Sequence, residues 1–290
     1  MNFTSEDIRT LRDKSGAGMM DCKNALNESN GDIEKAIEWL RKKGINTAQK
    51  KSSRVASDGL ITINISQNTG IILEINSETD FVARNENFQR FCDDISNTCI
   101  QNNIDNLDSL MNANFFNTDK LVKNKLTETV SKLGENIVIK RLKLVKENNS
   151  FLQKYLHNSV NTNSGKIGVL LVFSSKDFNK EVDNISRNLC MHIAAMNPQS
   201  IDIENLSSEL VEKEKSIYKE QLKLSGKPEE IIEKIVNGKL KKYYEDVCLL
   251  EQFFVMDTKT KIKDYLNSFN NKNNLEFKII SFFMFKLGQE

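Results

Sequence analysis

The feature that most constrains the fold is a stretch of sequence that occurs twice in related form. Gly70–Phe81 reads GIILEINSETDF, and Gly168–Phe178 reads GVLLVFSSKDF, which is one residue shorter. Each is followed at a similar distance by a second related pair, DDISNTC from Asp93 and DNISRNLC from Asp183. Both copies read as strand, turn and helix, so the sequence predicts two related α+β subdomains produced by duplication. The alternative is a chance match of one short segment.

The first copy contains a segment that is typical of a β-hairpin. GLITINIS and GIILEIN flank the turn QNTG, and Ile61, Ile63 and Ile65 alternate along the first strand. A helix is then indicated by apolar residues at helical spacing, namely Phe88, Phe91, Cys92, Ile95 and Cys99. This spacing places both cysteines in the core, which argues against a redox role. ENIVIKRLKLV follows as a strand, and LEFKIISFFMFKLG supplies a strand that completes the second copy.

The first 44 residues have the pattern of a compact three-helix unit. Thr4 with Asp7 is placed as an N-terminal cap, and the first helix is expected to end at Gly16. Asp32 is placed to cap the third helix, which we expect to end at Gly44. So small a core is marginally stable and has no cleft for chemistry. Its expected use is docking.

Two charged helices are predicted between Leu206 and Tyr244. Leu210, Ile217 and Leu224 lie seven residues apart, and the intervening SGKPEE offers Gly226 as a helix stop and Pro228 as a helix start. This pattern predicts an antiparallel helical hairpin that projects from the second subdomain. The expected divisions are a three-helix domain at residues 1–45, a basic linker at 46–58, the first subdomain at 59–148, the second at 149–200 with 245–290, and the hairpin at 201–244.

Composition excludes several classes of protein. The formal charge of +1 argues against a protein whose affinity comes from neutralising nucleic-acid phosphates. No apolar run approaches the roughly 18 residues of a membrane span. The N-terminal segment lacks the pattern of an export signal, so a cytoplasmic protein is expected. The five cysteines form no CxxC pair and only His157 and His192 could add imidazole, so no metal site is predicted.

Motifs for catalysis are also missing from the sequence. Gly165-Lys166 and Gly226-Lys227 lack the upstream glycine and the downstream Ser or Thr of a phosphate-binding loop. GxSxG, HExxH and GxGxxG do not occur. We therefore expect neither an enzyme nor a bound cofactor, and His157 and His192 are each ascribed to the surface or to the core.

Two sets of apolar side chains leave alternatives open. Phe81 lies in a polar loop, where its ring either folds back onto Phe88 or Ile75 or is presented to another protein. Met19 and Met20 are either gap-fillers of a small core or part of a docking surface. Because neighbouring residues of a helix point in different directions, we expect that one of the two methionines is exposed.

Two long motifs resemble the elongation factor Ts family. LRDKSGAGMMDCKNAL (Leu11–Leu26) is close to the family pattern LRxxTGAGMMDCKKAL, and TDFVARN (Thr79–Asn85) is the core signature of the family. Shorter stretches in the same order support the likeness: LGEN, MHIAA, SGKPEEI and FVM. The resemblance runs nearly from end to end.

This resemblance implies roles for particular residues. The first unit is expected to be a ubiquitin-associated-like domain that docks on the nucleotide-binding domain of elongation factor Tu through Arg12, Met19 and Met20. The loop of Thr79, Asp80, Phe81 and Val82 is expected to displace the Mg²⁺ ion of that partner, with Phe81 inserting between helices. Further partner contacts are expected at Leu133, Gly134, His157, Val255 and Met256.

The resemblance also implies a function. We expect a guanine-nucleotide exchange factor that binds Tu·GDP, promotes GDP release and stays on nucleotide-free Tu until GTP binds. A dimer of such complexes is one expected assembly, with no direct contact to nucleic acid or membrane. The alternative is a ubiquitin-associated-like adaptor or scaffold without exchange activity.

Overall fold

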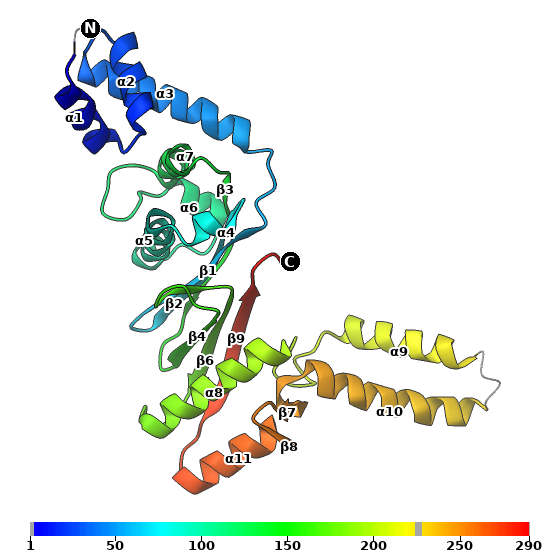
Figure 1. Cartoon of the computed structure of the whole chain (residues 1–290). Helices are drawn as coiled ribbons and strands as arrows, with labels where there is room; N and C mark the ends of the chain where they lie inside the picture. The colour runs from blue at the N-terminus through cyan, green and yellow to red at the C-terminus, as the bar shows by residue number, and fades with distance from the viewer. Residues whose placement is uncertain (1–2, 224–227, 290) are drawn as a thin grey trace. The chain divides into compact units, whose positions relative to one another are not determined.

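The computed structural model describes residues 3–223 and 228–289, which fall into two compact units (Figure 1). Unit 1 comprises residues 1–145, 156–168 and 285–290, and unit 2 comprises 146–155 and 169–284. Both units combine helices with strands, which confirms the predicted α+β class. The finer domain boundaries stay a prediction. Among the described residues, no helix has the length and apolar character needed to cross a bilayer.

The chain begins with three helices, α1 (Ser5–Ser15), α2 (Met19–Glu28) and α3 (Ile33–Lys51). The predicted caps are present: Thr4 and Asp7 bond reciprocally at the start of α1, and the side chain of Asp32 accepts from the backbone of Lys35. Gly16 ends α1 with a left-handed φ of 67°. The small core consists of Leu11, Cys22, Ala25, Leu26 and Ala36.

The predicted end of the third helix at Gly44 is wrong. Helix α3 continues to Lys51, so the first half of the segment expected as a linker is helical. Gly44 is buried, and a Cβ atom at this position would lie only 3.3 Å from the Ser131 Oγ atom. Close packing therefore accounts for a glycine inside this helix, where glycine usually costs about 1 kcal/mol relative to alanine.

Unit 1 is built on a four-stranded sheet in the order β3-β2-β1-β5. Its strands are β1 (Asp58–Ser66), β2 (Thr69–Ser77), β3 (Ile137–Lys146) and β5 (Ser164–Gly165). Strands β1 and β2 form the predicted antiparallel hairpin, with Ser66 opposite Thr69 at the turn. Burial on β2 is continuous rather than alternating, so this strand has no solvent face.

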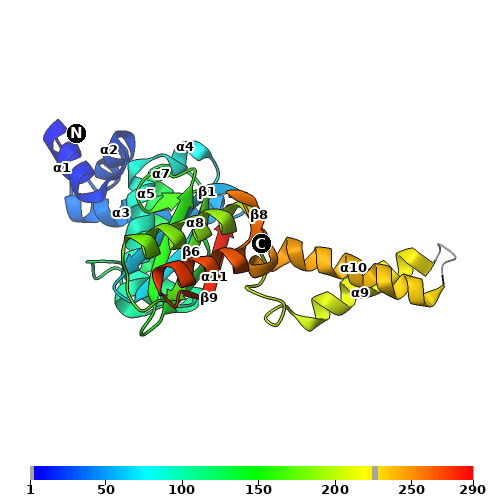
Figure 2. The same ribbon diagram turned by 90° about the horizontal axis from the view of Figure 1, so that it is seen from below.

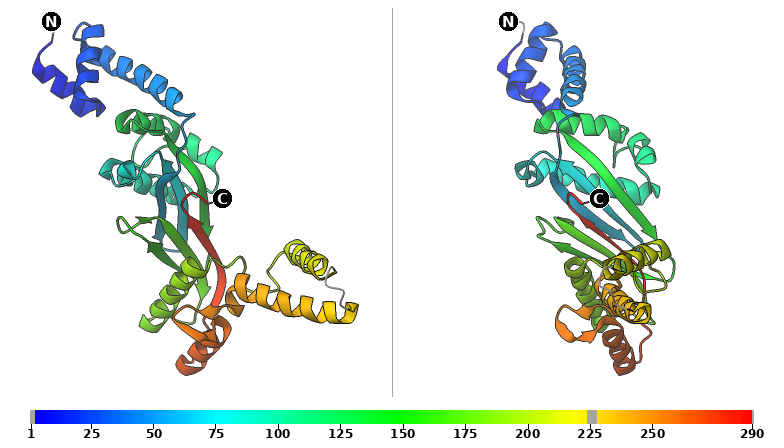
Figure 3. Two further views of the ribbon diagram at one scale, coloured as in Figure 1. Left: turned by 45° about the vertical axis from the view of Figure 1, so that its right-hand side comes forward. Right: turned by 90° about the vertical axis from the view of Figure 1, so that its right-hand side faces the viewer.

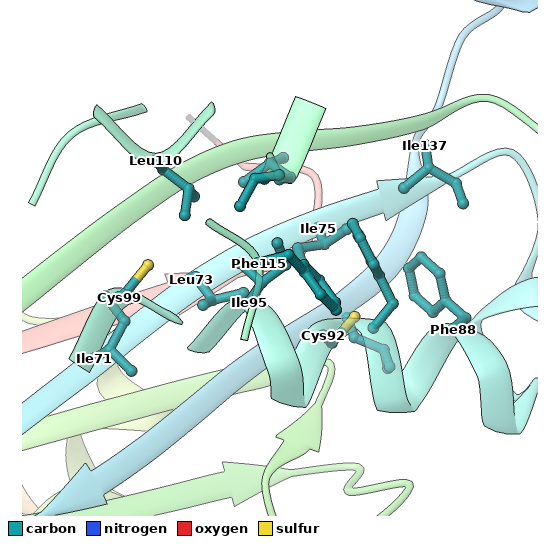
Figure 4. Packing of buried hydrophobic residues seen from close by; sticks show 14 of the residues in the cluster. Ile71, Leu73, Ile75, Phe88, Cys92, Ile95, Cys99, Leu110, Phe115 and Ile137 are labelled. Carbon is teal, nitrogen blue, oxygen red and sulfur yellow. The ribbon is translucent and has the colours of Figure 1, made fainter. Parts of the chain in front are cut away.

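Helices α4 (Asp80–Ala83), α5 (Glu86–Asn102), α6 (Leu107–Asn112) and α7 (Val122–Leu133) complete unit 1. Figure 4 shows the core of this unit, in which Phe88 of α5 lies beside Ile75 of β2 and Ile95 of α5 lies beside Leu73 of β2. Cys92 and Cys99 are fully buried as predicted. Burial raises the pKa of the Cys99 thiol to about 12, so this thiol stays protonated and packs as a core residue.

Most of unit 2 is formed by a second strand-and-helix assembly. Its strands β4 (Phe151–His157), β6 (Ile167–Ser174) and β9 (Lys278–Lys286) pair in the order β4-β6-β9. Helices α8 (Lys180–Met196) and α11 (Ile262–Asn273) come between β6 and β9 in the chain. The first sheet repeats this arrangement. Its strands β1, β2 and β3 correspond to β4, β6 and β9, and helices α5 and α7 come between β2 and β3 in the chain.

The repeated sequence is matched by repeated hydrogen bonds. In unit 1 the Ser96 hydroxyl donates to the Asp93 carbonyl at 2.7 Å, and in unit 2 the Ser186 hydroxyl donates to the Asp183 carbonyl at 2.9 Å. An amide side chain from the first strand of each set reaches the same hydroxyl: Asn64 from β1 at 3.4 Å and Gln153 from β4 at 3.2 Å. These matched contacts support two related subdomains.

The helical hairpin consists of α9 (Ser208–Lys223) and α10 (Glu229–Val247). The two helices run side by side in Figure 2 and in both views of Figure 3. Leu210 and Ile217 remain 41% and 37% exposed, because two helices cover only part of an apolar seam. Leu224 and the predicted helix stop at Gly226 lie outside the described residues. After α10 the chain forms a 3₁₀ turn (Leu249–Glu251) and a small hairpin of β7 (Phe253–Phe254) and β8 (Asp257–Lys261).

Candidate functional site

Phe81 lies on a one-turn helix directly after β2. Strand β2 ends at Ser77 and α4 begins at Asp80, with Thr79 in an extended conformation as its cap. Successive helical residues differ by about 100° in direction, so Val82 and Phe81 face different sides. Val82 is buried in the core of unit 1, whereas Phe81 is 81% exposed. The ring is therefore not folded back onto its own subdomain.

The loop before Phe81 is held by a second loop from a distant part of the chain. The backbone N–H of Thr79 donates to the Glu135 carboxylate at 3.0 Å, and the Thr79 hydroxyl donates to it at 2.6 Å. In the opposite direction, the backbone N–H of Asn136 donates to the Glu78 carboxylate at 2.6 Å. Each loop thus supplies one carboxylate that binds the backbone of the other.

A third segment, between α3 and β1, closes this arrangement. The Arg54 guanidinium lies 3.6 Å from the Glu78 carboxylate, and the Asn136 side-chain amide donates to the Arg54 carbonyl at 2.8 Å. We call Arg54, Glu78, Thr79, Glu135 and Asn136 the loop clamp. Its hydrogen bonds to the Glu78 and Glu135 carboxylates are stronger than hydrogen bonds between neutral groups, and they restrict the backbone that carries Phe81.

Asp80 is the first residue of α4 and pairs with Arg84 at 3.4 Å. Both side chains are substantially exposed, at 45% and 76%. An ion pair exposed in this way contributes little to folding stability. The Asp80 carboxylate is therefore open to a partner.

Leu133 and Gly134 lie beside the loop clamp, because they immediately precede Glu135. Leu133 ends α7 and is half-buried against the core of unit 1. Gly134 follows with a left-handed φ of 77°, is exposed, and accepts a hydrogen bond from the Lys51 ammonium at its carbonyl. The fold thus brings these two predicted site residues together with the Thr79–Val82 loop.

The predicted residues of the three-helix unit form an exposed group of their own. Met19 and Met20 are 49% and 65% exposed, and Arg12 is exposed as well. At least one exposed methionine was expected, and both are exposed, because both lie in the first turn of α2. The core positions of this helix begin only at Cys22.

The remaining predicted residues lie on other elements. His157 is the last residue of β4, is exposed, and its carbonyl accepts from the Lys166 N–H at 3.0 Å. Val255 and Met256 form the turn between β7 and β8 in unit 2, where they are 41% and 53% exposed. All three side chains are accessible within their own units.

The clamp residues Arg54, Glu78, Glu135 and Asn136 were not among the predicted site residues. The sequence held a weak signal for two of them, because Glu135 and Asn136 belong to LGEN and stand next to predicted contacts. Nothing in the sequence pairs Glu135 with Thr79, since 56 residues separate them. Arg54 falls in the segment that was expected to be a linker.

The chemistry open to this surface is that of binding. A ring that is 81% exposed cannot exclude water from a reacting group, but it can bury its own surface on another protein. Among the described residues, no group of three or more His, Cys, Asp or Glu side chains is arranged to hold a metal ion. The site is best described as a projecting apolar ring on a clamped loop.

Comparison with known proteins gives consistent matches. The family model described as elongation factor TS matches residues 78–289. Elongation factor Ts of Rhodospirillum centenum is 40% identical over 97% of this chain and 92% of its own length. The proteins of the same name from Rickettsia bellii and Halothermothrix orenii are 40% and 41% identical, each over 100% of this chain and 93% of their own lengths.

Proposed function

The chain belongs to the elongation factor Ts family of translation elongation factors, and on that premise we propose that it promotes GDP release from elongation factor Tu. The observation that carries the proposal is the exposure of Phe81 on the clamped loop. The ring enters the nucleotide-binding domain of Tu and disturbs its Mg²⁺ site, and Thr79, Asp80 and Val82 complete the inserted segment.

Burial of the ring on the partner supplies the driving force. Covering one Phe side chain contributes about 1.5 to 3 kcal/mol. This gain is kept only if little conformational entropy is lost on binding, and a loop that is already fixed loses less. The loop clamp provides that fixation, because it ties the residues before Phe81 to two other segments.

The effect on GDP follows from thermodynamic linkage. A protein that binds nucleotide-free Tu more tightly than Tu·GDP must lower the affinity of Tu for GDP by the same factor. Each difference of about 1.4 kcal/mol corresponds to a tenfold change in affinity. Displacing a Mg²⁺ ligand also weakens the hold on the phosphates directly. No covalent bond is broken in this process, and the factor stays bound until GTP enters.

Contacts away from the ring increase affinity for the same partner. Arg12, Met19 and Met20 dock on the nucleotide-binding domain through the first unit, where flexible methionines suit an adaptable surface. Leu133 and Gly134 contact it beside the inserted loop. His157, Val255 and Met256 add further contacts, the last two through unit 2.

The test is release of a fluorescent GDP analogue from Tu in the presence of the full chain. Phe81→Ala should slow release at least about tenfold, because one buried ring is lost on the partner. Phe178→Ala is the matched control: this ring occupies the equivalent place in the repeat and is 48% exposed, but it packs against Phe151 of its own unit with ring centroids 5.1 Å apart. The control should keep exchange activity.

Two results would contradict the proposal. One is release no faster with the unsubstituted chain than without it, which would favour the adaptor alternative. The other is equal activity of Phe81→Ala and Phe178→Ala when circular dichroism shows both variants to be folded.

A further inference from the structure

His192 is fully buried in α8, and it is not one of the proposed partner-contact residues. Both of its ring nitrogens have partners. The backbone N–H of Val255 donates to Nδ1 at 3.2 Å, and Nε2 lies 3.0 Å from Oε1 of Gln252. A backbone N–H can only donate, so Nδ1 is the acceptor and the neutral ring carries its proton on Nε2. Nε2–H then donates to Gln252.

Gln252 extends this contact into a chain of hydrogen bonds. Its side chain is fully buried, and its amide nitrogen donates to the Asp246 carbonyl at 2.7 Å and to the Met196 carbonyl at 3.5 Å. Asp246 lies in the last turn of α10. The chain therefore runs from the end of the helical hairpin through Gln252 and His192 to Val255. Buried polar groups that are fully satisfied in this way specify one arrangement of their neighbours.

The segment at the end of this chain presents apolar side chains to solvent. Phe253, Val255 and Met256 are 42%, 41% and 53% exposed, whereas Phe254 between them is buried against Tyr265 with ring centroids 4.5 Å apart. The pairing of β7 with β8 is short and irregular, with a register shift at Phe253 and Phe254. Strand pairing alone is weak support for such a turn. The bond from Val255 to His192 supplies a further fixed point.

We propose that His192 and Gln252 are positioning residues that fix the turn Phe253–Met256 for docking on a protein partner. That partner is elongation factor Tu, so the identity of the partner rests on the function proposed above. Neither side chain touches the partner, since both are fully buried. They act by holding the backbone from which Val255 and Met256 project.

The environment of His192 agrees with this role. Burial lowers the pKa of its imidazole, and the hydrogen bond to Gln252 opposes this only in part. The imidazole is therefore neutral near neutral pH, and a neutral ring with its proton on Nε2 can accept the hydrogen bond from Val255 at Nδ1. A second proton would place an N–H group against the Val255 N–H and break the bond.

Two substitutions separate positioning from simple core packing. In His192→Asn the carboxamide oxygen can take the place of Nδ1 and still accept from Val255. In His192→Gln the longer side chain reaches toward Gln252 but leaves the Val255 N–H without an acceptor. Measured by GDP release from Tu, His192→Gln should raise the half-saturating concentration about tenfold, as for an unpaired buried donor. His192→Asn should have a half-saturating concentration close to that of the unsubstituted chain.

The maximal release rate should hardly change in either variant, because the Phe81 loop belongs to the other unit. Equal half-saturating concentrations for the two variants, whether both normal or both raised, would overturn the positioning role. If the unsubstituted chain does not promote GDP release at all, the proposed function fails, and the positioning role is then decided by a spectroscopic measurement.

That measurement uses the unsubstituted full chain and does not depend on Tu. The sequence contains only two histidines, so nitrogen NMR of the imidazoles gives two sets of signals, which His157→Gln assigns. His192 should be the Nε2–H tautomer near neutral pH, and the Val255 amide should exchange slowly with solvent. A proton on Nδ1, or fast exchange at Val255, would overturn the proposal even if the His192 variants fail to fold.

Discussion

At the scale of single residues, the position of Phe81 depends on Glu135. Glu135→Ala removes both hydrogen bonds to Thr79, so the loop should sample other conformations and GDP release should slow about fivefold to tenfold. Glu135→Gln is the matched control, because its carboxamide can accept from the Thr79 N–H and donate to the Thr79 hydroxyl. The measurement is GDP release with each variant.

The same substitution in a Phe81→Ala background tests the route of the effect. If Glu135 acts by placing the Phe81 ring, then Glu135→Ala should slow GDP release only slightly when Phe81 is already replaced by alanine. If Glu135→Ala slows GDP release by the same factor with and without the Phe81 ring, Glu135 does not act by placing the ring.

His192 predicts a pH dependence of stability. Its pKa is lowered in the folded chain, so below the ordinary histidine value of about 6.5 the unfolded chain binds a proton that the folded chain does not. The free energy of unfolding should therefore fall as pH drops from about 7 to about 5.5, above the range where carboxylates titrate. His192→Asn should flatten this slope in urea titrations. An unchanged slope would exclude His192 as its source.

Sequence reasoning works at this scale where partners are close along the chain. The cap formed by Thr4 and Asp7 and the burial of Cys92 and Cys99 were predictable because local spacing determines them. The sequence does not decide whether Phe81 is exposed, because exposure depends on where a single helical turn is placed after β2. The contact of Thr79 with Glu135 required the tertiary fold.

At the scale of elements, the two glycines inside long helices, Gly44 and Gly238, differ in how closely their neighbours pack against them. Gly238 lies in the middle of α10, and nothing is within 4 Å of the position that a Cβ atom would take. Gly238→Ala should therefore raise the free energy of unfolding by about 0.5 to 1 kcal/mol, through helix propensity alone. The measurement is urea denaturation followed by circular dichroism.

Gly44 provides the comparison for this prediction. Its Cβ atom would meet the Ser131 side chain at 3.3 Å, so crowding should cancel some or all of the gain in propensity. Gly44→Ala should stabilise the chain less than Gly238→Ala. The opposite ranking would mean that packing against Ser131 is not why α3 contains a glycine.

Most of the elements that sequence patterns missed are short, although the seven-residue strand β4 and the five-residue strand β8 were missed as well. Helix α4 has four residues, and strands β5 and β7 have two each. Periodicity needs several residues to be recognised, so such elements leave no pattern. Most of the longer strands and helices can be predicted in type. The error at Gly44 arises because glycine often ends a helix and the sequence does not show that Gly44 packs against Ser131.

At the scale of the whole molecule, the duplication preserved the framework and changed the loop. The first copy has helix α4 after its second strand, and its ring is exposed. The second copy, one residue shorter, has no helix between Ser174 and Lys180. The Phe178 ring is 48% exposed and lies against Phe151 and Phe173, with ring centroids 5.1 and 6.2 Å away. The repeat could be predicted from the sequence. Which copy exposes its ring more fully could not, because that follows from the geometry of the loop.

Because the proposed contacts lie in different units, their effects on exchange should be separable. Phe81→Ala should lower the maximal rate of GDP release, since the ring acts on the nucleotide site. Met256→Ala, in unit 2, should instead raise the half-saturating concentration, since its side chain only adds binding area. Without shared partner atoms, the two free-energy changes should add to within about 0.5 kcal/mol in the double variant. A larger discrepancy in the measured kinetics would mean that unit 2 also takes part in opening the nucleotide site.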